Sequence, residues 1–333
     1  MYDILKDLCE INGTSGTENA VRDYIISKID GFCEYRTDPL GNILFEKKGK
    51  KKAKTRVMLD AHMDEVGFII TGITAEGFLR FSPVGGIKRE AMLFHRVMIN
   101  GSVPGVIGSK PFHLCKKEEL KSPPDTERMY IDIGASSKKQ AQKYVSEGDT
   151  GVMCGDFIRT GENIISKALD DRVGCAVLIK LIREDPLYGF CGSFSVMEEI
   201  GCIGAGTAAF TLCPDAAIVL EGTTAADIAG VPADKQVCKS GCGVAVSFMD
   251  GGTVYDRGFS DMALASGITA QKKKATTGGN DAAAIHKCRG GVKTLALSVP
   301  CRYIHSSGSV CSVRDIDSMY ALAKYMTEKL QDI

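Results

Sequence analysis

The sequence lacks the usual marks of a membrane, secreted or nucleic-acid-binding protein. No apolar run approaches the roughly 20 residues of a membrane-spanning helix, and the acids Asp3, Asp7 and Glu10 do not fit a secretory signal. Neither charge is in excess, because 41 Lys and Arg residues balance 41 Asp and Glu residues. Proteins that bind phosphate backbones usually carry a basic excess. We therefore expect a cytoplasmic protein with neither a membrane nor a nucleic-acid partner.

Two widespread enzyme signatures are also missing. The glycines between Gly201 and Gly206 follow a predicted strand but do not have the order G-x-G-x-x-G, and Glu198 and Glu199 just before them would repel a pyrophosphate. No G-x-S-x-G segment is present, so a Ser–His–Asp hydrolase has no support. The 13 cysteines have no paired spacing and are expected to act as small buried hydrophobic residues.

What the chain does have is the length and patterning of two domains. A length of 333 residues exceeds one typical domain. Residues 68–160 are rich in glycine and short β-like runs, which indicates a small all-β module. Helix and strand patterns alternate elsewhere, which is typical of an α/β core with a mostly parallel sheet. The expected organisation is a discontinuous catalytic α/β domain, 1–67 plus 161–333, with an inserted β-barrel-like domain at 68–160.

Candidate chemical groups follow several predicted strands. In open α/β sheets, sites form just beyond the carboxyl ends of the strands. Strands predicted at 57–61, 193–197, 216–220 and 294–299 would therefore bring their following residues to one crevice. Those residues are His62, the pair Glu198 and Glu199, Glu221 and His305.

Two further acids, Asp170 and Asp171, stand where a helix is predicted to begin. Taken alone, Asp170 reads as a helix N-cap and His62 as a hydrogen-bonded histidine at a strand end. Taken together, so many carboxylates would repel one another without cations. Mixed nitrogen and oxygen ligands suit zinc, cobalt or manganese. Asp64 could share the site by accepting the second N–H of a metal-bound His62.

Four short motifs occur along the chain in a fixed order. They are DAHMDEVG (60–67), ALDDRVG (168–174), EEIG (198–201) and PCRYIHS (300–306). Together they resemble the glutamyl aminopeptidase or tetrahedral (TET) aminopeptidase family of cocatalytic metallopeptidases, also labelled cellulase M or endoglucanase M. The resemblance covers nearly the whole chain, including the inserted β domain.

The resemblance implies a two-metal site. One divalent ion would be held by His62, Asp170 and Glu221, and the second by Asp170, Glu199 and His305, with Asp170 bridging. Glu198 would be the general base and Asp64 would orient His62. The resemblance also implies a cis peptide between the two neighbouring aspartates, and a homo-oligomer of dimers that build a tetrahedral dodecamer through the inserted domain.

The implied reaction is hydrolysis of the first peptide bond of peptides with a free N-terminus, through a metal-bridging water. Its alternatives are a metal-dependent deacylase of N-acyl amino acids, a glycoside hydrolase, and a non-catalytic metal-binding scaffold. Three departures from the family pattern bear on substrate and metal. Glu221 stands where relatives often have Asp, Asn280 replaces a usual Thr beside Asp281, and no acid follows His305 closely. The sequence therefore names neither the preferred first residue nor the metal.

Overall fold

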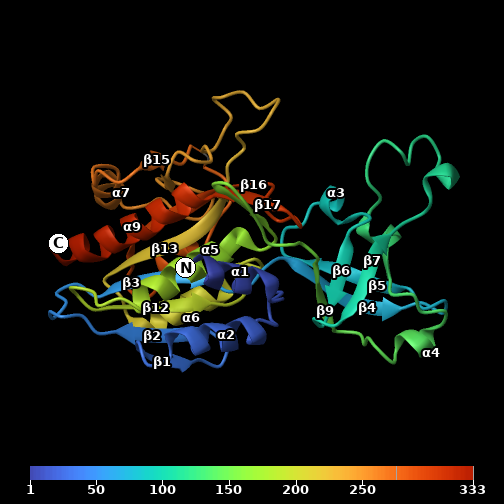
Figure 1. Ribbon diagram of the computed structural model, residues 1–333, viewed down its shortest axis with the longest axis horizontal. Coiled ribbons are helices and arrows are strands. Elements are labelled where there is room, and N and C mark those ends of the chain that lie inside the picture. The colour runs from blue at the N-terminus through green and yellow to red at the C-terminus, as the bar shows by residue number, and fades with distance from the viewer. Residues whose placement is uncertain (275, 333) are drawn as a thin grey trace.

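The computed structural model describes residues 1–274 and 276–332 and has two lobes, a large α/β domain and a smaller β-barrel (Figure 1). The strands of the large domain are β1 (Glu34–Thr37), β2 (Ile43–Lys47), β3 (Val57–His62), β10 (Ile158–Thr160), β11 (Asn163–Ser166), β12 (Phe190–Ser195), β13 (Ala216–Thr224), β14 (Val244–Val246), β15 (Ala270–Lys272), β16 (Lys293–Arg302) and β17 (Ser309–Ser312). Its helices are α1 (Tyr2–Glu10), α2 (Asn19–Ile29), α5 (Leu169–Ile182), α6 (Ile203–Leu212), α7 (Arg257–Leu264), α8 (Ala282–Ile285), α9 (Val313–Lys329) and the 3-10 turn Leu330–Asp332.

The centre of the large sheet is parallel and its flanks are antiparallel. Strand β3 pairs in parallel with β12 and β13, and β13 pairs in parallel with β16. The pairs β1–β2, β2–β12, β16–β17, β17–β11 and β11–β10 are antiparallel. The expected parallel-core α/β class is thus confirmed. The four central strands run in one direction, so their carboxyl ends meet at one edge of the sheet.

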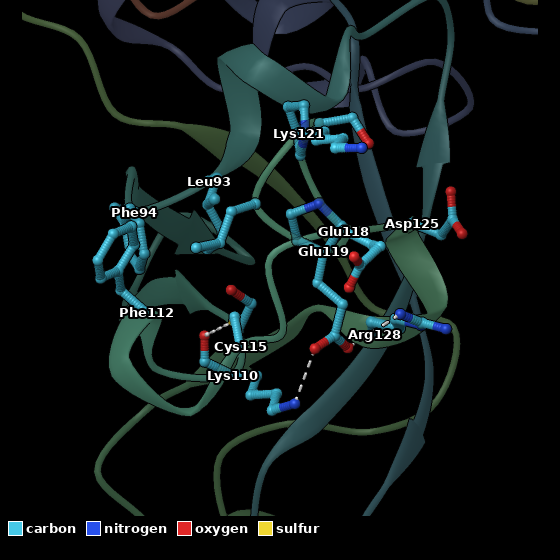
Figure 2. A pocket seen from close by; sticks show the side chains of 15 residues that line it. Leu93, Phe94, Lys110, Phe112, Cys115, Glu118, Glu119, Lys121, Asp125 and Arg128 are labelled. Carbon is cyan, nitrogen blue, oxygen red and sulfur yellow. Dashed lines mark hydrogen bonds and ion pairs between the residues drawn. The ribbon is translucent and has the colours of Figure 1, made fainter.

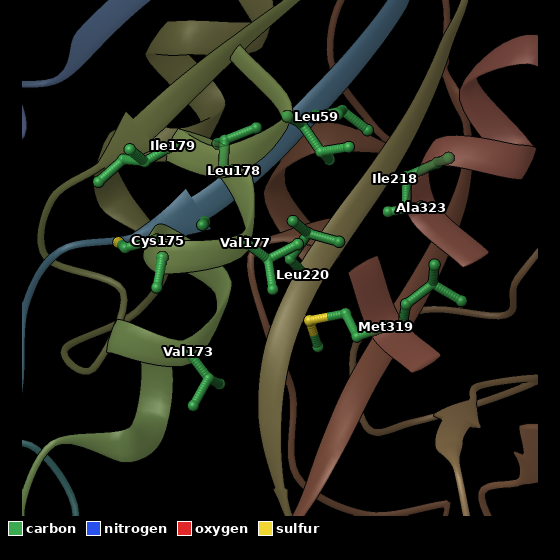
Figure 3. Close-up of a cluster of buried hydrophobic side chains, with 14 of the residues drawn as sticks. Leu59, Val173, Cys175, Val177, Leu178, Ile179, Ile218, Leu220, Met319 and Ala323 are labelled. Atoms are coloured by element: carbon green, nitrogen blue, oxygen red, sulfur yellow. The ribbon is translucent and has the colours of Figure 1, made fainter. Parts of the chain in front are cut away.

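Successive side chains of each central strand point to opposite faces of the sheet, so apolar residues are buried on both faces. In β3, Leu59 belongs to the apolar cluster that contains residues of α5 and α9, while its neighbour Met58 belongs to the cluster that contains residues of α6 and α8. In β13, Leu220 and Val219 divide in the same way. Figure 3 shows the larger core, where side chains of β3 and β13 meet those of α5 and α9. Burial on both faces explains why these strands read as nearly continuous apolar runs.

The smaller lobe is a closed barrel with its own apolar core. Its strands are ordered β4-β5-β8-β7-β6-β9 around the barrel. Phe68, Phe81 and Ile131 are among its buried side chains. The barrel elements are β4 (Gly67–Ile73), β5 (Leu79–Val84), α3 (Arg89–Met92), β6 (Arg96–Ile99), β7 (Val103–Gly108), the 3-10 turns Phe112–Leu114 and Thr126–Arg128, β8 (Tyr130–Asp132), α4 (Lys138–Ala141) and β9 (Thr150–Met153).

Some element boundaries differ from the expected ones. The barrel ends at Met153, and β10 already pairs with β11 in the large sheet, so the chain leaves the barrel before the expected boundary at 160. Strand β13 continues past Leu220, which puts Glu221 inside the strand. Strand β16 continues through Pro300. On the side of β16 away from β13, residues 297 and 298 pair with β14 and residues 301 and 302 pair with β17. Pro300 lies between these two paired segments, so the N–H that proline lacks is not needed for a hydrogen bond on that side.

Within the described residues, no helix combines the length and the apolarity that crossing a membrane requires.

Candidate active site

His62 ends strand β3 with its imidazole buried and its two nitrogens in different surroundings. Nδ1 lies 3.1 Å from the backbone carbonyl oxygen of Asp64 and 3.3 Å from Asp64 Oδ1. Both oxygens are acceptors, so Nδ1 is the protonated nitrogen and donates a hydrogen bond to them. Nε2 points at carboxylates, 3.5 Å from Asp170 Oδ1 and 3.8 Å from Glu221 Oε2. A neutral His62 would therefore aim a lone pair at negative oxygens, an arrangement that a cation between them stabilises.

His305 repeats this arrangement from the far end of β16. Its Nδ1–H donates to the carbonyl oxygen of Gly86 in the barrel lobe at 2.9 Å. Its Nε2 lies 3.2 Å from Glu199 Oε1 and 3.4 Å from Asp170 Oδ2. The barrel thus orients one of the two site histidines, and the structure brings His62 and His305 to opposite oxygens of one carboxylate.

Asp170 lies between the two histidines because β13 lets it approach closely. Its Oδ1 accepts the backbone N–H of Gly222 at 3.2 Å. A Cβ atom at Gly222 would stand 2.8 Å from that oxygen, so only glycine leaves room for the carboxylate. Asp170 has non-helical backbone angles, and its peptide bond to Asp171 is cis. Asp170 is therefore no N-cap; Ala168 occupies that position.

The carboxylates and histidines of the site strongly perturb one another's pKa values. Burial raises the pKa of Glu198 to about 8, with His62 opposing and other acids reinforcing the rise. Burial also raises the pKa of Glu221 well above its usual range. Burial acts against the charged form of His305, but Asp170 and Glu199 outweigh it and raise the His305 pKa to about 11. Strongly shifted pKa values in a cluster of neighbouring acids and histidines are typical of a functional site.

Divalent metal ions fit this set of donors. Among the described residues, His62 Nε2 and Glu221 Oε1 are buried and have no hydrogen-bond partner. Buried polar atoms without a partner are costly, and a bound cation would satisfy both. Ligand atoms of His62, Asp170 and Glu199 lie within 4.8 Å of one another, and so do those of Asp170, Asp171 and Glu221. The second group includes Asp171, which the sequence did not propose as a ligand.

Asp64 links β3 to the loop that follows β12. Its Oδ1 accepts the backbone N–H of Glu198 at 3.0 Å, and its Oδ2 accepts that of Glu199 at 3.1 Å. The hydroxyl of Ser15 donates to Oδ2 at 2.6 Å. Asp64 therefore contacts the imidazole of His62 and also fixes the backbone of two further site residues.

Glu198 faces the same space, with its Oε2 4.0 Å from His62 Nε2. The Cys202 thiol donates to Glu198 Oε1 at 3.5 Å. Ligand atoms of Glu198, Cys202 and Asp281 lie within 4.8 Å of one another. Sequence reasoning missed Cys202, although its place four residues after Glu198, just before a helix, could have suggested a local contact.

Sequence reasoning gave no role to two buried acids behind the site, Asp281 and Asp60. Ser195 donates to Asp281 Oδ2 at 2.6 Å, and Ser193 donates to Asp60 Oδ1, so two buried aspartates lie beneath the β12 end of the sheet. Asp281 ends the segment 278–281, whose similarity to a family motif marked it in the sequence without assigning it a role. Asp60 opens the first of the four motifs and stands within the otherwise apolar strand β3.

Comparisons with known proteins show the family to which the chain is related. The model of the M42 glutamyl aminopeptidase family matches residues 41–322. The glutamyl aminopeptidase of Lactococcus lactis is 30% identical, over 95% of this chain and 92% of that protein. The lysyl aminopeptidase of Pyrococcus furiosus is also 30% identical, over 99% of this chain and 97% of that protein. A solved TET1 peptidase of Pyrococcus horikoshii is 32% identical with a TM-score of 0.85, over 97% of this chain and 98% of that one.

A parallel α/β core with a histidine–carboxylate cluster at its strand ends is the architecture of a metallohydrolase. The chain belongs to the M42 glutamyl aminopeptidase family and is a metallo-aminopeptidase.

Proposed function

We propose that the protein removes single residues from the N-termini of peptides by means of two divalent cations. His62, Asp170 and Glu221 would hold one ion, and Asp170, Glu199 and His305 the other, with zinc or cobalt favoured and manganese a third choice. The observation that carries this proposal is the position of Asp170, whose two oxygens lie 3.5 Å from His62 Nε2 and 3.4 Å from His305 Nε2. A carboxylate between two imidazoles is suited to bridging a pair of ions.

Bound cations would supply Lewis acidity toward the scissile carbonyl and would lower the pKa of water from about 15.7 to roughly 7. Glu198 would act as the general base, and its position facing this space, outside both proposed ligand sets, supports that role. It would take the proton from the attacking water and deliver it to the leaving amine. Asp64 would act through others, holding His62 and the backbone of Glu198 in place.

A substrate panel tests the proposal. Aminoacyl-p-nitroanilides, N-acetyl amino acids and carboxymethylcellulose are each incubated with protein loaded with zinc, cobalt or manganese. We expect hydrolysis of the aminoacyl-p-nitroanilides, which carry a free α-amino group, and of neither other substrate. Turnover of the N-acetyl amino acids alone would support a deacylase, turnover of the cellulose derivative a glycosidase, and tight metal without any turnover a scaffold.

We further propose that copies of the chain assemble through the barrel lobe into a tetrahedral dodecamer. The Pyrococcus horikoshii relative is described as assembling into a tetrahedron or a large octahedral shell. In this chain the barrel lobe carries a cavity of about 600 Å³, and Phe94 and Phe112 stand beside it (Figure 2). The two residues are 69% and 76% exposed. Exposed apolar patches of this kind commonly mark protein contacts.

Light scattering after size-exclusion chromatography tests this assembly. The wild type should elute at the mass of twelve chains, and a Phe94→Ser/Phe112→Ser double variant should elute as smaller species. The exposed aromatic residue Phe210 lies on α6 of the large domain, so Phe210→Ser is the matched control and should still assemble. A monomeric wild type would contradict the proposal.

A further inference from the structure

The histidines of the two proposed metal sites are supported by different lobes. His62 ends strand β3, and its Nδ1–H donates to the carbonyl oxygen of Asp64 in the large domain. His305 stands in the loop between β16 and β17 with a φ of +59°, and its Nδ1–H donates to the carbonyl oxygen of Gly86 in the barrel lobe. The side chain of His305 is 28% exposed, against 1% for His62. His305 therefore takes from the barrel an orientation that His62 takes from its own domain.

Glu199, the other residue proposed to bind only the ion of His305, also packs against the barrel. A Cβ atom at Gly85 would stand 3.2 Å from Glu199 Cβ and 2.9 Å from Val66 Cγ1. Gly85 has a φ of +80°, a conformation that favours glycine. The glycine turn (residues 85 and 86, directly after β5) thus touches both residues that belong to this metal site alone.

Two further contacts hold the loop of His305 against the barrel side of the molecule (Figure 1). The hydroxyl of Ser307 lies 3.3 Å from Nδ1 of His95, which directly precedes β6. A Cβ atom at Gly155, two residues after the end of β9, would stand 2.1 Å from the carbonyl oxygen of Ser307. The side chain of His62, in contrast, contacts residues of the large domain, namely Asp64, Asp170, Glu198 and Glu221.

We propose that the glycine turn of the barrel positions the ligands of the ion held by Asp170, Glu199 and His305, and that the ion held by His62 does not depend on this turn. The inference rests on the proposed function, since it presupposes the two ligand sets. Gly85 and Gly86 are positioning residues that act through the orientation of Glu199 and His305. Altering groups that orient metal ligands typically lowers metal affinity about 10- to 100-fold. The barrel lobe thus sets the affinity of one metal site without supplying a ligand.

Zinc titration calorimetry on metal-free protein tests the inference. His305→Ala removes a proposed ligand and so identifies which binding step belongs to the barrel-side ion. In Gly85→Ala that step should show a Kd at least about tenfold higher than in the wild type, because the added methyl group pushes the turn and Glu199 apart. The other step should keep its wild-type Kd. If Gly85→Ala does not fold, as judged by circular dichroism, Gly85→Asn carries the same test, since asparagine adopts positive φ more readily.

Two glycines of the same lobe supply matched controls. Gly134 has a φ of +77° and open space around it, so Gly134→Ala measures backbone strain alone. Gly77 has a φ of +95°, and a Cβ atom there would stand 2.8 Å from the carbonyl oxygen of Ala135, so Gly77→Ala adds a comparable overlap at the other end of β5. Both controls should bind zinc as the wild type does. Weakening of the barrel-side ion in Gly77→Ala, equal weakening of both ions in Gly85→Ala, or wild-type binding by folded Gly85→Ala would each overturn the inference.

Hydrolysis assays on the same proteins separate this inference from the proposed reaction. If the barrel-side ion depends on Gly85 while the zinc-loaded wild type hydrolyses no aminoacyl-p-nitroanilide, the positioning role stands and the proposed reaction fails. If the wild type hydrolyses these substrates while Gly85→Ala binds both ions with wild-type affinity, the positioning role fails and the reaction stands.

Discussion

The side-chain carboxylate of Asp64 accepts the backbone N–H of Glu198 at 3.0 Å. One acid after strand β3 therefore fixes the loop after strand β12, which carries the proposed base. The same carboxylate binds the next N–H, that of Glu199, through its other oxygen. We therefore propose that Asp64 positions residues of both proposed metal sites, beyond its contact with His62.

Replacement of Asp64 by asparagine tests this role. The amide has one acceptor oxygen in place of two, so at least one of the N–H groups of Glu198 and Glu199 loses its partner. We expect metal affinity to fall about 10- to 100-fold by zinc titration calorimetry, as for other groups that support metal ligands. The backbone carbonyl of residue 64 remains available to His62. Asp3→Asn, at an exposed acid in helix α1, is the control. An unchanged zinc affinity would contradict the positioning role.

Glu198→Gln separates the base from the ligands. The amide keeps the shape of the side chain but cannot take a proton, so the loss in kcat should be about 10²- to 10⁴-fold. Zinc content, measured by atomic absorption, should stay at the wild-type level because Glu198 belongs to neither proposed ligand set. The exposed Glu147 in the barrel lobe supplies the matched substitution, Glu147→Gln, with wild-type kcat. Near wild-type turnover by Glu198→Gln would show that another group is the base.

Removal of metal should destabilise the folded state. A ligand that binds only the folded chain stabilises it by about 2.7 kcal/mol when its free concentration is 100 times Kd. Metal binding would also relieve the repulsion among the buried carboxylates around Asp170. We expect EDTA to lower the Tm of the wild type in calorimetry and to change that of Asp170→Asn little. Identical melting of the wild type with and without EDTA would count against a resident metal.

Asp315 predicts a pH dependence of stability away from the active site. It lies in the first turn of α9, and its carboxylate accepts the backbone N–H groups of Gly241 and Gly243, each at 2.7 Å. Burial outweighs these bonds and raises the Asp315 pKa to about 6. The folded chain therefore binds more protons here than the unfolded chain, whose Asp pKa is about 3.9. This contribution to stability is present below that unfolded value and is lost as pH rises through the folded pKa.

Urea unfolding at pH 4 and pH 7 measures the effect against Asp315→Asn, which cannot titrate. The stability of the wild type relative to the variant should increase on acidification by on the order of 2 kcal/mol. Other carboxylates titrate in both proteins and cancel in the difference. A difference that stays constant or shrinks between pH 7 and pH 4 would refute the assignment.

Local patterns in the sequence determined the layout of the fold and the content of the site. Apolar runs predicted β3 and the other central strands. The candidate site residues stand at the end of each predicted strand or just after it. The rule that parallel strands end at one edge then brings His62 and His305 together without any knowledge of loops. The glycine-rich texture likewise marked the inserted barrel, because short strands need frequent turns.

Only the tertiary structure decided which remaining groups face that edge. In the sequence, Gly85 is one of two consecutive glycines, and its approach to Glu199 depends on how the barrel lobe packs on the large domain. Asp64 and Glu198 are 134 residues apart, and Asp170 reads locally as a helix cap. Helical and strand periodicities report the exposure of a residue only within its own element. Contacts between elements depend on how packed layers align, and no short stretch of sequence contains that information.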